Sequence, residues 1–153
     1  MNLVSLLEPD VVKTPLEGAF KDEVIAELVE LLVRAGKVTD RQGVLDALYD
    51  REEKGSTGIG GGVAIPHARH PDVTDAVLAI GIAPDGIEFD AVDDQPVRIV
   101  FLLVGAPDKP GQAVETLADI GALVQIPGVY DKLACAREAE EIIRIVEGAR
   151  QEL

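Results

Sequence analysis

The sequence contains VRIVFLLV at residues 97–104 and AVLAIGIA at residues 76–83, two nearly continuous aliphatic runs of strand length. Apolar and polar residues scarcely alternate in either run, which is the pattern of strands that are covered on both faces. Between the runs, residues 84–86 (PDG) have the chemistry of a turn, and residues 87–89 alternate like a short edge strand. We therefore expect the two runs to be the central strands of a sheet.

Helical periodicity surrounds these strands. Apolar residues recur at helical spacing within residues 24–35, 44–48, 113–124 and 142–149, and a short helical turn is expected at 130–133. Thr39 and Gln42 have the spacing of a capping box, so the second helix is expected to begin there and to end near Lys54. Short strands are expected at residues 11–13 and 63–65. The elements predict an α/β fold, a three-layer sandwich with a mixed β-sheet flanked by helices on both faces, in a single domain of residues 1–153.

The composition limits the class of protein. The 153 residues carry 28 acidic and 14 basic side chains, a formal net charge of −14, without any segment rich in Lys or Arg. Such a charge disfavours binding to nucleic acid and to anionic membrane surfaces. The longest apolar run has eight residues, whereas about 20 are needed to cross a bilayer. The single Cys135 permits no internal disulfide, so we expect a cytoplasmic protein without membrane insertion.

A glycine-rich segment, GSTGIGGG at residues 55–62, holds five glycines, which suggests positive φ angles or a close backbone approach to a ligand. Its backbone N–H groups can face an oxyanion, and two hydroxyl groups add further donors. The candidate phosphate-binding residues are Ser56, Thr57, Gly58, Gly60 and Gly61. The alternative is a flexible turn, because the segment has neither a P-loop ending nor a dinucleotide-binding pattern.

His67 follows Pro66 directly at the end of the short strand expected at residues 63–65. Because proline restricts the backbone of the residue before it, this strand sets where the imidazole emerges. A neutral imidazole can take a phosphoryl group on nitrogen and release it again, although a single His is more often structural. Arg51 ends the apolar stripe of the second helix, where it can neutralise a phosphoryl dianion or cap the last carbonyls. His67 and Arg51 are the candidate catalytic residues.

His70 offers an alternative reading of the same segment, a two-His metal site with Asp72 or Asp75 as the third ligand. Pro71 argues against a helix that would align the two imidazoles. We therefore expect neither a metal nor a cofactor, and we expect His70 to be an exposed loop residue.

These motifs resemble the enzyme IIA domains of fructose, mannitol and nitrogen-regulatory type (type 2) in the bacterial phosphotransferase system. The resemblance runs from Arg51-Glu52 through residues 56–60 (STGIG) to residues 63–69 (VAIPHAR) and extends over nearly the whole chain. It implies that His67 accepts a phosphoryl group from the phosphohistidine of HPr or its nitrogen-branch counterpart, and that Arg51 belongs to the same site. His67 would then pass the group to an enzyme IIB or use it as a switch toward a regulatory target protein. The alternative is a non-transferring regulatory or degenerate interaction module of the same fold.

The sequence departs from this family at one position. Enzyme IIA domains of this type usually carry a second active-site His at the start of the helix that follows an Ala-Pro turn. The equivalent stretch here places Ala113 at that position, or alternatively Gln112, and no His occurs beyond residue 70. The resemblance implies that onward transfer is less efficient here, whereas acceptance by His67 is retained. Which ring nitrogen reacts depends on what the other nitrogen binds.

Overall fold

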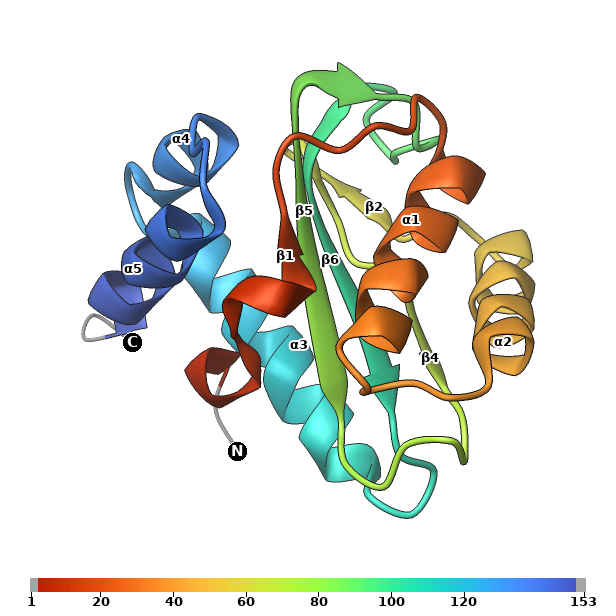
Figure 1. Ribbon diagram of the computed structural model, residues 1–153. Coiled ribbons are helices and arrows are strands. Elements are labelled where there is room, and N and C mark those ends of the chain that lie inside the picture. Colours follow the sequence, from red (N-terminus) through yellow and green to blue (C-terminus); the bar gives the residue numbers. More distant parts are fainter. Residues whose placement is uncertain (1–2, 151–153) are drawn as a thin grey trace.

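The computed structural model describes residues 3–150, with side chains for residues 3–149. It contains a six-stranded mixed sheet between two layers of helices, as the sequence predicts (Figure 1). The strands are β1 (Val12–Lys13), β2 (Gly58–Gly60), β3 (Val63–Ala64), β4 (His67–Arg69), β5 (Val77–Ile87) and β6 (Val97–Gly105). The helices are α1 (Lys21–Arg34), α2 (Arg41–Glu53), α3 (Pro110–Gln125), α4 (Val129–Ala134) and α5 (Ala139–Arg150), with 3-10 turns η1 (Leu3–Leu6) and η2 (Pro9–Val11). No helix in this described part is long and apolar enough to cross a membrane.

The centre of the sheet is the antiparallel pair of β5 and β6, the two aliphatic runs. The strand order is β1-β5-β6-β3-β2, and β4 also pairs with β6. Both β3 and β4 run parallel to β6, one after the other along the same strand: Val63 pairs with Ile99, and His67 pairs with Leu103. Residues 63–69 are therefore held along their length by one central strand.

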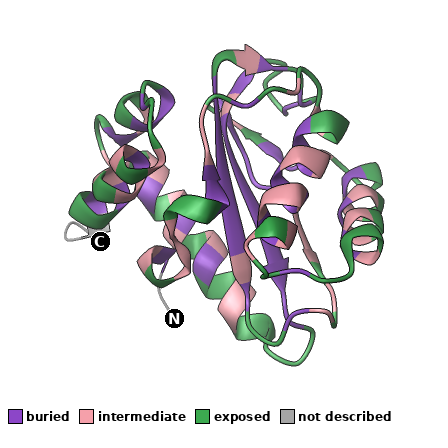
Figure 2. Ribbon diagram, viewed as in Figure 1, coloured by how far each residue is buried: buried purple, intermediate pink, exposed green. Residues whose placement is uncertain are grey.

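The helices divide between the two faces of the sheet. Figure 1 shows α1 and α2 on one face and α3, α4 and α5 on the other. Figure 2 shows that β5 and β6 are buried along most of their length, whereas the helices alternate buried and exposed positions. Because both faces of these strands are covered, no polar residue is needed on alternate positions, which explains the apolar runs in the sequence.

Helix α1 contributes a wide buried stripe, formed by Val24, Ile25, Leu28, Val29 and Leu32. Helix α2 contributes a narrower one, and its three buried residues are Val44, Leu48 and Glu52. The prediction of a Thr39 capping box is wrong by one residue, because Asp40 is the N-cap and accepts a hydrogen bond from the Gly43 N–H at 3.0 Å. The Thr39 hydroxyl instead donates to Asp72, which stabilises a carboxylate of the neighbouring loop.

The strands also differ from the prediction at three places. Residues 84–86 do not end a strand, because β5 continues through them to Ile87 with an irregular register opposite β6. The strand expected at residues 63–65 is confirmed as β3. Strand β2, inside the glycine-rich segment, and strand β4, which begins at His67, were not predicted. Both strands have only three residues, which is too short for a pattern of alternating side chains to be recognised.

Candidate active site

An open cavity of about 480 Å³ lies between α2, β4 and the first half of α3. Its polar lining consists of Asp50, Arg51, Lys54, His67 and Arg69. Helix α3 supplies an apolar wall that includes Ala113 and Val114. The cavity thus brings together His67 and Arg51, the two predicted catalytic residues, which come from different layers of the fold.

His67 is half-buried and its ring is held by the backbone. The Nδ1 atom lies 2.6 Å from the carbonyl oxygen of Ile65. Because a carbonyl oxygen only accepts hydrogen bonds, Nδ1 must carry the hydrogen, and the lone pair of the neutral ring then resides on Nε2. The Leu103 N–H donates to the Pro66 carbonyl at 2.9 Å, which ties the residue before His67 to β6.

Arg51 lies near the C-terminal end of α2 and is half-buried. Its Nη1 donates to the carbonyl oxygen of Gly55 at 2.8 Å, just beyond the helix. The same side chain lines the cavity that contains His67. The hydrogen bond to a carbonyl at the end of the helix agrees with the capping interpretation of Arg51, and its role toward a phosphoryl group stays a prediction.

The five predicted phosphate-binding residues do not line this cavity. The Ser56 hydroxyl donates to the Phe89 carbonyl at 2.8 Å and accepts from the Gly58 N–H at 3.0 Å. The Gly61 N–H donates to Asp93 at 3.0 Å, and Gly60 pairs with β3. Their role in phosphate binding stays a prediction. In the structure these contacts hold the glycine-rich segment against its neighbours.

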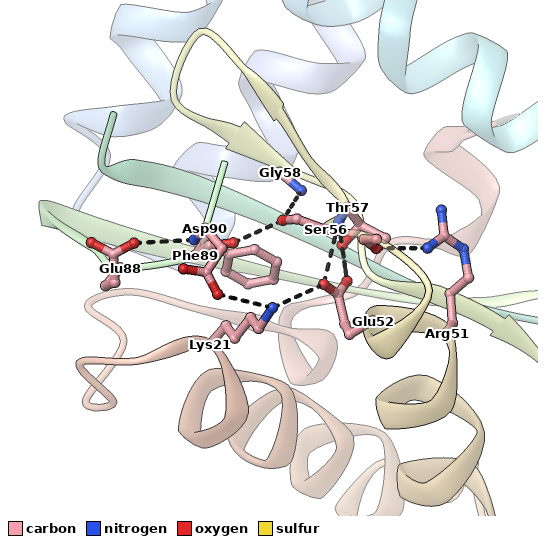
Figure 3. A network of polar contacts seen from close by, with 10 residues as sticks. Lys21, Arg51, Glu52, Ser56, Thr57, Gly58, Glu88, Phe89 and Asp90 are labelled. Atoms are coloured by element: carbon pink, nitrogen blue, oxygen red, sulfur yellow. Dashed lines mark hydrogen bonds and ion pairs between the residues drawn. The ribbon is translucent and has the colours of Figure 1, made fainter. Parts of the chain in front are cut away.

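Thr57 belongs to a buried network around Glu52, whose exposed fraction is 6% (Figure 3). The Thr57 hydroxyl and the Thr57 N–H, the latter at 3.2 Å, both donate to the Glu52 carboxylate. Lys21 lies 3.6 Å from Glu52 and 3.2 Å from Asp90. The network joins the end of α2 to α1, the glycine-rich segment and the loop after β5. It therefore immobilises the residue next to Arg51.

Glu52 is not identified as an interior residue in the sequence analysis, because carboxylates are seldom buried. The spacing of Val44, Leu48 and Glu52 is i, i+4 and i+8, which puts Glu52 on the buried face of α2. That spacing is the signal that could have found it.

Two further cations in the cavity were also missed. Lys54 and Arg69 are exposed, and neither side chain has a hydrogen-bond or ion-pair partner among residues 3–149. Together with Arg51 they make three cations, against the single carboxylate of Asp50. The cavity thus has a formal excess of two positive charges, in a chain whose net charge is −14. The N-terminal turn of α3, which carries no acidic residue, adds its positive dipole end at the same place. The cavity therefore favours an anion.

The structure distinguishes Ala113 from Gln112 at the position where the resemblance implies a second His. Ala113 lines the cavity. The Gln112 side chain instead accepts from the Ala76 N–H at 2.9 Å and donates to Asp75 at 2.8 Å. Of the two candidates, Ala113 is the one that lines the cavity, and it offers no polar group there.

His70 lies apart from the cavity lining. Its Nδ1 accepts from the Asp72 N–H at 3.0 Å, and its Nε2 lies 3.6 Å from Asp40, the N-cap of α2. His70 is half-buried rather than exposed as predicted, because it packs between these two carboxylate-bearing residues. Its contacts anchor the start of α2.

Comparison with known proteins places this chain in a family. Residues 5–149 match the model of the family described as "Phosphoenolpyruvate-dependent sugar phosphotransferase system, EIIA 2". The fructose-specific EIIA component of Haloferax volcanii is 41% identical over 142 residues, which cover 93% of this chain and 87% of that protein. The fructose-specific EIIABC component of Bacillus subtilis is 34% identical over 95% of this chain, but the chain spans only 23% of its length.

Solved structures agree with this relationship. The nitrogen regulatory protein IIA-Ntr from Neisseria meningitidis superposes with a TM-score of 0.85 at 30% identity, covering 94% of this chain and 98% of that one. The enzyme IIA of mannitol type from Escherichia coli, solved in complex with phosphorylated enzyme IIB, has the same fold, with a TM-score of 0.78 at 21% identity over 93% and 97% of the two chains. The chain therefore belongs to the EIIA 2 family of the phosphoenolpyruvate-dependent sugar phosphotransferase system, whose members are phosphotransfer components.

Proposed function

We propose that this protein is a phosphocarrier in which Nε2 of His67 accepts a phosphoryl group from the phosphohistidine of an HPr-type carrier protein. The observation that carries the proposal is the shared cavity of His67 and Arg51, with Nδ1 of His67 held at 2.6 Å from the Ile65 carbonyl. Because Nδ1 carries the hydrogen, Nε2 has the lone pair that can attack phosphorus.

The transfer exchanges one nitrogen–phosphorus bond for another. Nε2 of His67 forms a bond to phosphorus while the bond to the donor histidine breaks, and the donor nitrogen keeps the electron pair. The phosphoryl group moves with its three terminal oxygens. The His67 ring keeps its Nδ1 proton, and the Ile65 carbonyl stabilises the positive charge that develops on the ring. Arg51 offers a matching charge for the dianion.

Two fates of the phosphoryl group are supported by different observations. The mannitol enzyme IIA of Escherichia coli forms a complex with phosphorylated enzyme IIB, and by analogy His67 would pass its group to a IIB-type acceptor. The relative from Neisseria meningitidis is a nitrogen regulatory protein, which supports a second candidate function, a switch toward a regulatory target protein. Ala113 favours the switch, because the cavity lacks the second imidazole that the resemblance implies for the family and that would help onward transfer.

A phosphorylation assay tests the carrier proposal. The protein is incubated with phosphoenolpyruvate, enzyme I and HPr, and its mass is measured. We expect a gain of one phosphate that is lost in acid, as for a phosphohistidine. The chain has two histidines, so His67→Ala and His70→Gln form a matched pair: the first must abolish the gain and the second must retain it. Label on His67→Ala, or none on the unmodified protein, refutes the proposal.

A second assay separates the two fates. Labelled protein is mixed with enzyme IIB, and label on the IIB is followed over time. Transfer from His67 to IIB identifies a transport carrier. Label that stays on His67 with every cognate IIB, together with a partner that binds only one of the two phosphorylation states, identifies a switch.

A further inference from the structure

Arg69 is exposed, but its position in β4 places it in the lining of the candidate site. His67 and Arg69 are two residues apart in β4, so their side chains leave the same side of the strand. Both line the cavity. Their backbone is fixed by β6, since His67 pairs with Leu103 and Arg69 pairs with Gly105. The strand pair thus fixes the backbone from which both side chains leave toward the cavity.

Small residues make room for Arg69 on this wall. A Cβ atom built on Gly105 would lie 3.1 Å from the Ala113 Cβ and 3.7 Å from the Arg69 Cγ. The stem of Arg69 and the methyl group of Ala113 therefore both border the space that Gly105 leaves open. Position 113 and Arg69 thus line the same part of the cavity, where Ala113 offers no polar group and Arg69 offers a guanidinium.

The guanidinium of Arg69 is uncommitted within the part of the chain that the structure describes. None of residues 3–149 accepts a hydrogen bond from its side chain or pairs with it. Arg51, by contrast, already gives one nitrogen to the Gly55 carbonyl. A phosphoryl group on histidine carries three oxygens and nearly two negative charges, more than one partly occupied guanidinium can match.

We infer that Arg69 is the second anion-binding residue of the site, and that it contacts the phosphoryl oxygens from the side of the cavity where Ala113 provides no imidazole. The inference rests on the proposed phosphorylation of His67 and gives a role to the last residue of the 63–69 motif, to which the resemblance assigns none. Arg51 approaches the phosphoryl group from α2 and Arg69 approaches it from β4. Their two guanidinium groups then hold it between the layers of the fold.

The test compares Arg69→Gln with a matched charge control, Arg144→Gln. Arg144 is exposed on α5, outside the cavity lining, and its replacement removes the same charge from the chain. Rates of phosphorylation of His67 are measured over a range of HPr concentrations. We expect Arg69→Gln to lower the rate at saturating donor by about 10- to 100-fold, the usual loss for one charge-assisted hydrogen bond. Arg144→Gln should keep the rate within about twofold, as expected for a surface position.

A spectroscopic measurement checks the contact itself. The ³¹P NMR signal of phosphorylated His67 is followed against pH in the unmodified protein, Arg69→Gln and Arg144→Gln. Loss of a bound guanidinium makes the phosphoryl group take up its last proton at higher pH. The midpoint of the titration should therefore shift to higher pH in Arg69→Gln and stay unchanged in Arg144→Gln. Arg69→Lys should recover part of the rate, because it restores the charge without the fork of donors.

Three results would overturn the inference while leaving phosphorylation of His67 intact. The first is an unchanged rate and an unchanged ³¹P titration in Arg69→Gln. The second is an equal loss in Arg69→Gln and Arg144→Gln, which marks a general charge effect. The third is a loss confined to low HPr concentration, which places Arg69 in docking of the donor. A protein that never gains phosphate on His67 refutes the proposed function itself, which is a separate outcome.

Discussion

Thr57 donates two hydrogen bonds to the carboxylate of Glu52, one from its hydroxyl and one from its backbone N–H at 3.2 Å. Glu52 is buried, and the preceding residue, Arg51, lines the cavity with His67. The pair therefore joins the interior of the fold to the candidate site. A buried carboxylate is tolerated only when its hydrogen-bond capacity is met, which makes each donor to Glu52 costly to remove.

Replacement of the Thr57 hydroxyl should destabilise the protein. In Thr57→Val the side chain keeps its shape but leaves one oxygen of Glu52 without its strongest donor, and we expect a loss of about 1–3 kcal/mol in the free energy of unfolding. Thr57→Ser keeps the hydroxyl and should lose less than half as much. Urea denaturation of both variants measures the difference. Equal losses would show that the missing methyl group, and not the hydrogen bond, controls stability.

The sequence predicts the central sheet well because β5 and β6 are buried on both faces, and this burial requires nearly continuous apolar runs that can be recognised in the sequence. The same holds for the stripe of α1. It predicts His67 and Arg51 as a pair only through their chemistry, since nothing in the spacing of residues 51 and 67 indicates that α2 and β4 lie next to each other. That neighbourhood comes from the register of β4 on β6, a long-range pairing.

The sequence predicts least well which hydrogen-bond partner a polar side chain binds when two partners are available. Ser56 and Thr57 have hydroxyls suited to a phosphate, yet each donates within the protein, to Phe89 and to Glu52. Thr39 and Asp40 are both good N-caps, and the choice falls on Asp40 because Asp72 engages Thr39. In each case the competing partner is more than thirty residues away or buried by the fold, so local sequence does not identify it.

Substitution at Gly62 should be far more damaging than substitution at its neighbour Gly61. Both have positive φ, 80° and 65°, so each alanine variant has a backbone cost of about 1–2 kcal/mol. A Cβ at Gly62 would in addition overlap the hydroxyl of Tyr130, whereas a Cβ at Gly61 meets nothing within 4 Å. We expect Gly62→Ala to lose about 1–3 kcal/mol more than Gly61→Ala in urea denaturation. Equal losses would mean that Tyr130 moves aside freely.

Acid should weaken the contact between β1 and α1. Burial acts to raise the pKa of the Glu27 carboxyl, but hydrogen bonds from Lys13 and from two backbone N–H groups outweigh burial and leave the pKa below 4.5. Because its pKa is lower in the folded state, Glu27 contributes its full share of stability above the pKa that it has in the unfolded chain. This share is lost as the pH falls through the pKa of the folded state. We expect stability to decline below about pH 4.5 and the decline to be shallower in Glu27→Gln. Thermal unfolding from pH 6 to pH 3 measures both slopes, and parallel curves would exclude Glu27 as a contributor.

An imidazole at position 113 should replace the function inferred for Arg69. Ala113 lines the cavity from the first turn of α3 and, like the Arg69 stem, borders the space that Gly105 leaves open. In the double variant Arg69→Gln/Ala113→His, the new ring gains the room that the shorter side chain leaves and can donate to the phosphoryl oxygens. We expect His67 to be phosphorylated about tenfold faster in the double variant than in Arg69→Gln alone.

The control for this recovery is Val114→His in the same Arg69→Gln background. Val114 also lines the cavity, but it is 66% exposed and lies one residue further along α3, so its side chain leaves the helix about 100° away from that of Ala113. An imidazole there keeps the added titratable group while directing it to solvent. Recovery by both variants would indicate that any added histidine suffices. Recovery by Ala113→His alone ties the effect to the part of the cavity wall that Ala113 and Arg69 share, because the two positions add the same imidazole and differ only in the direction in which it leaves α3.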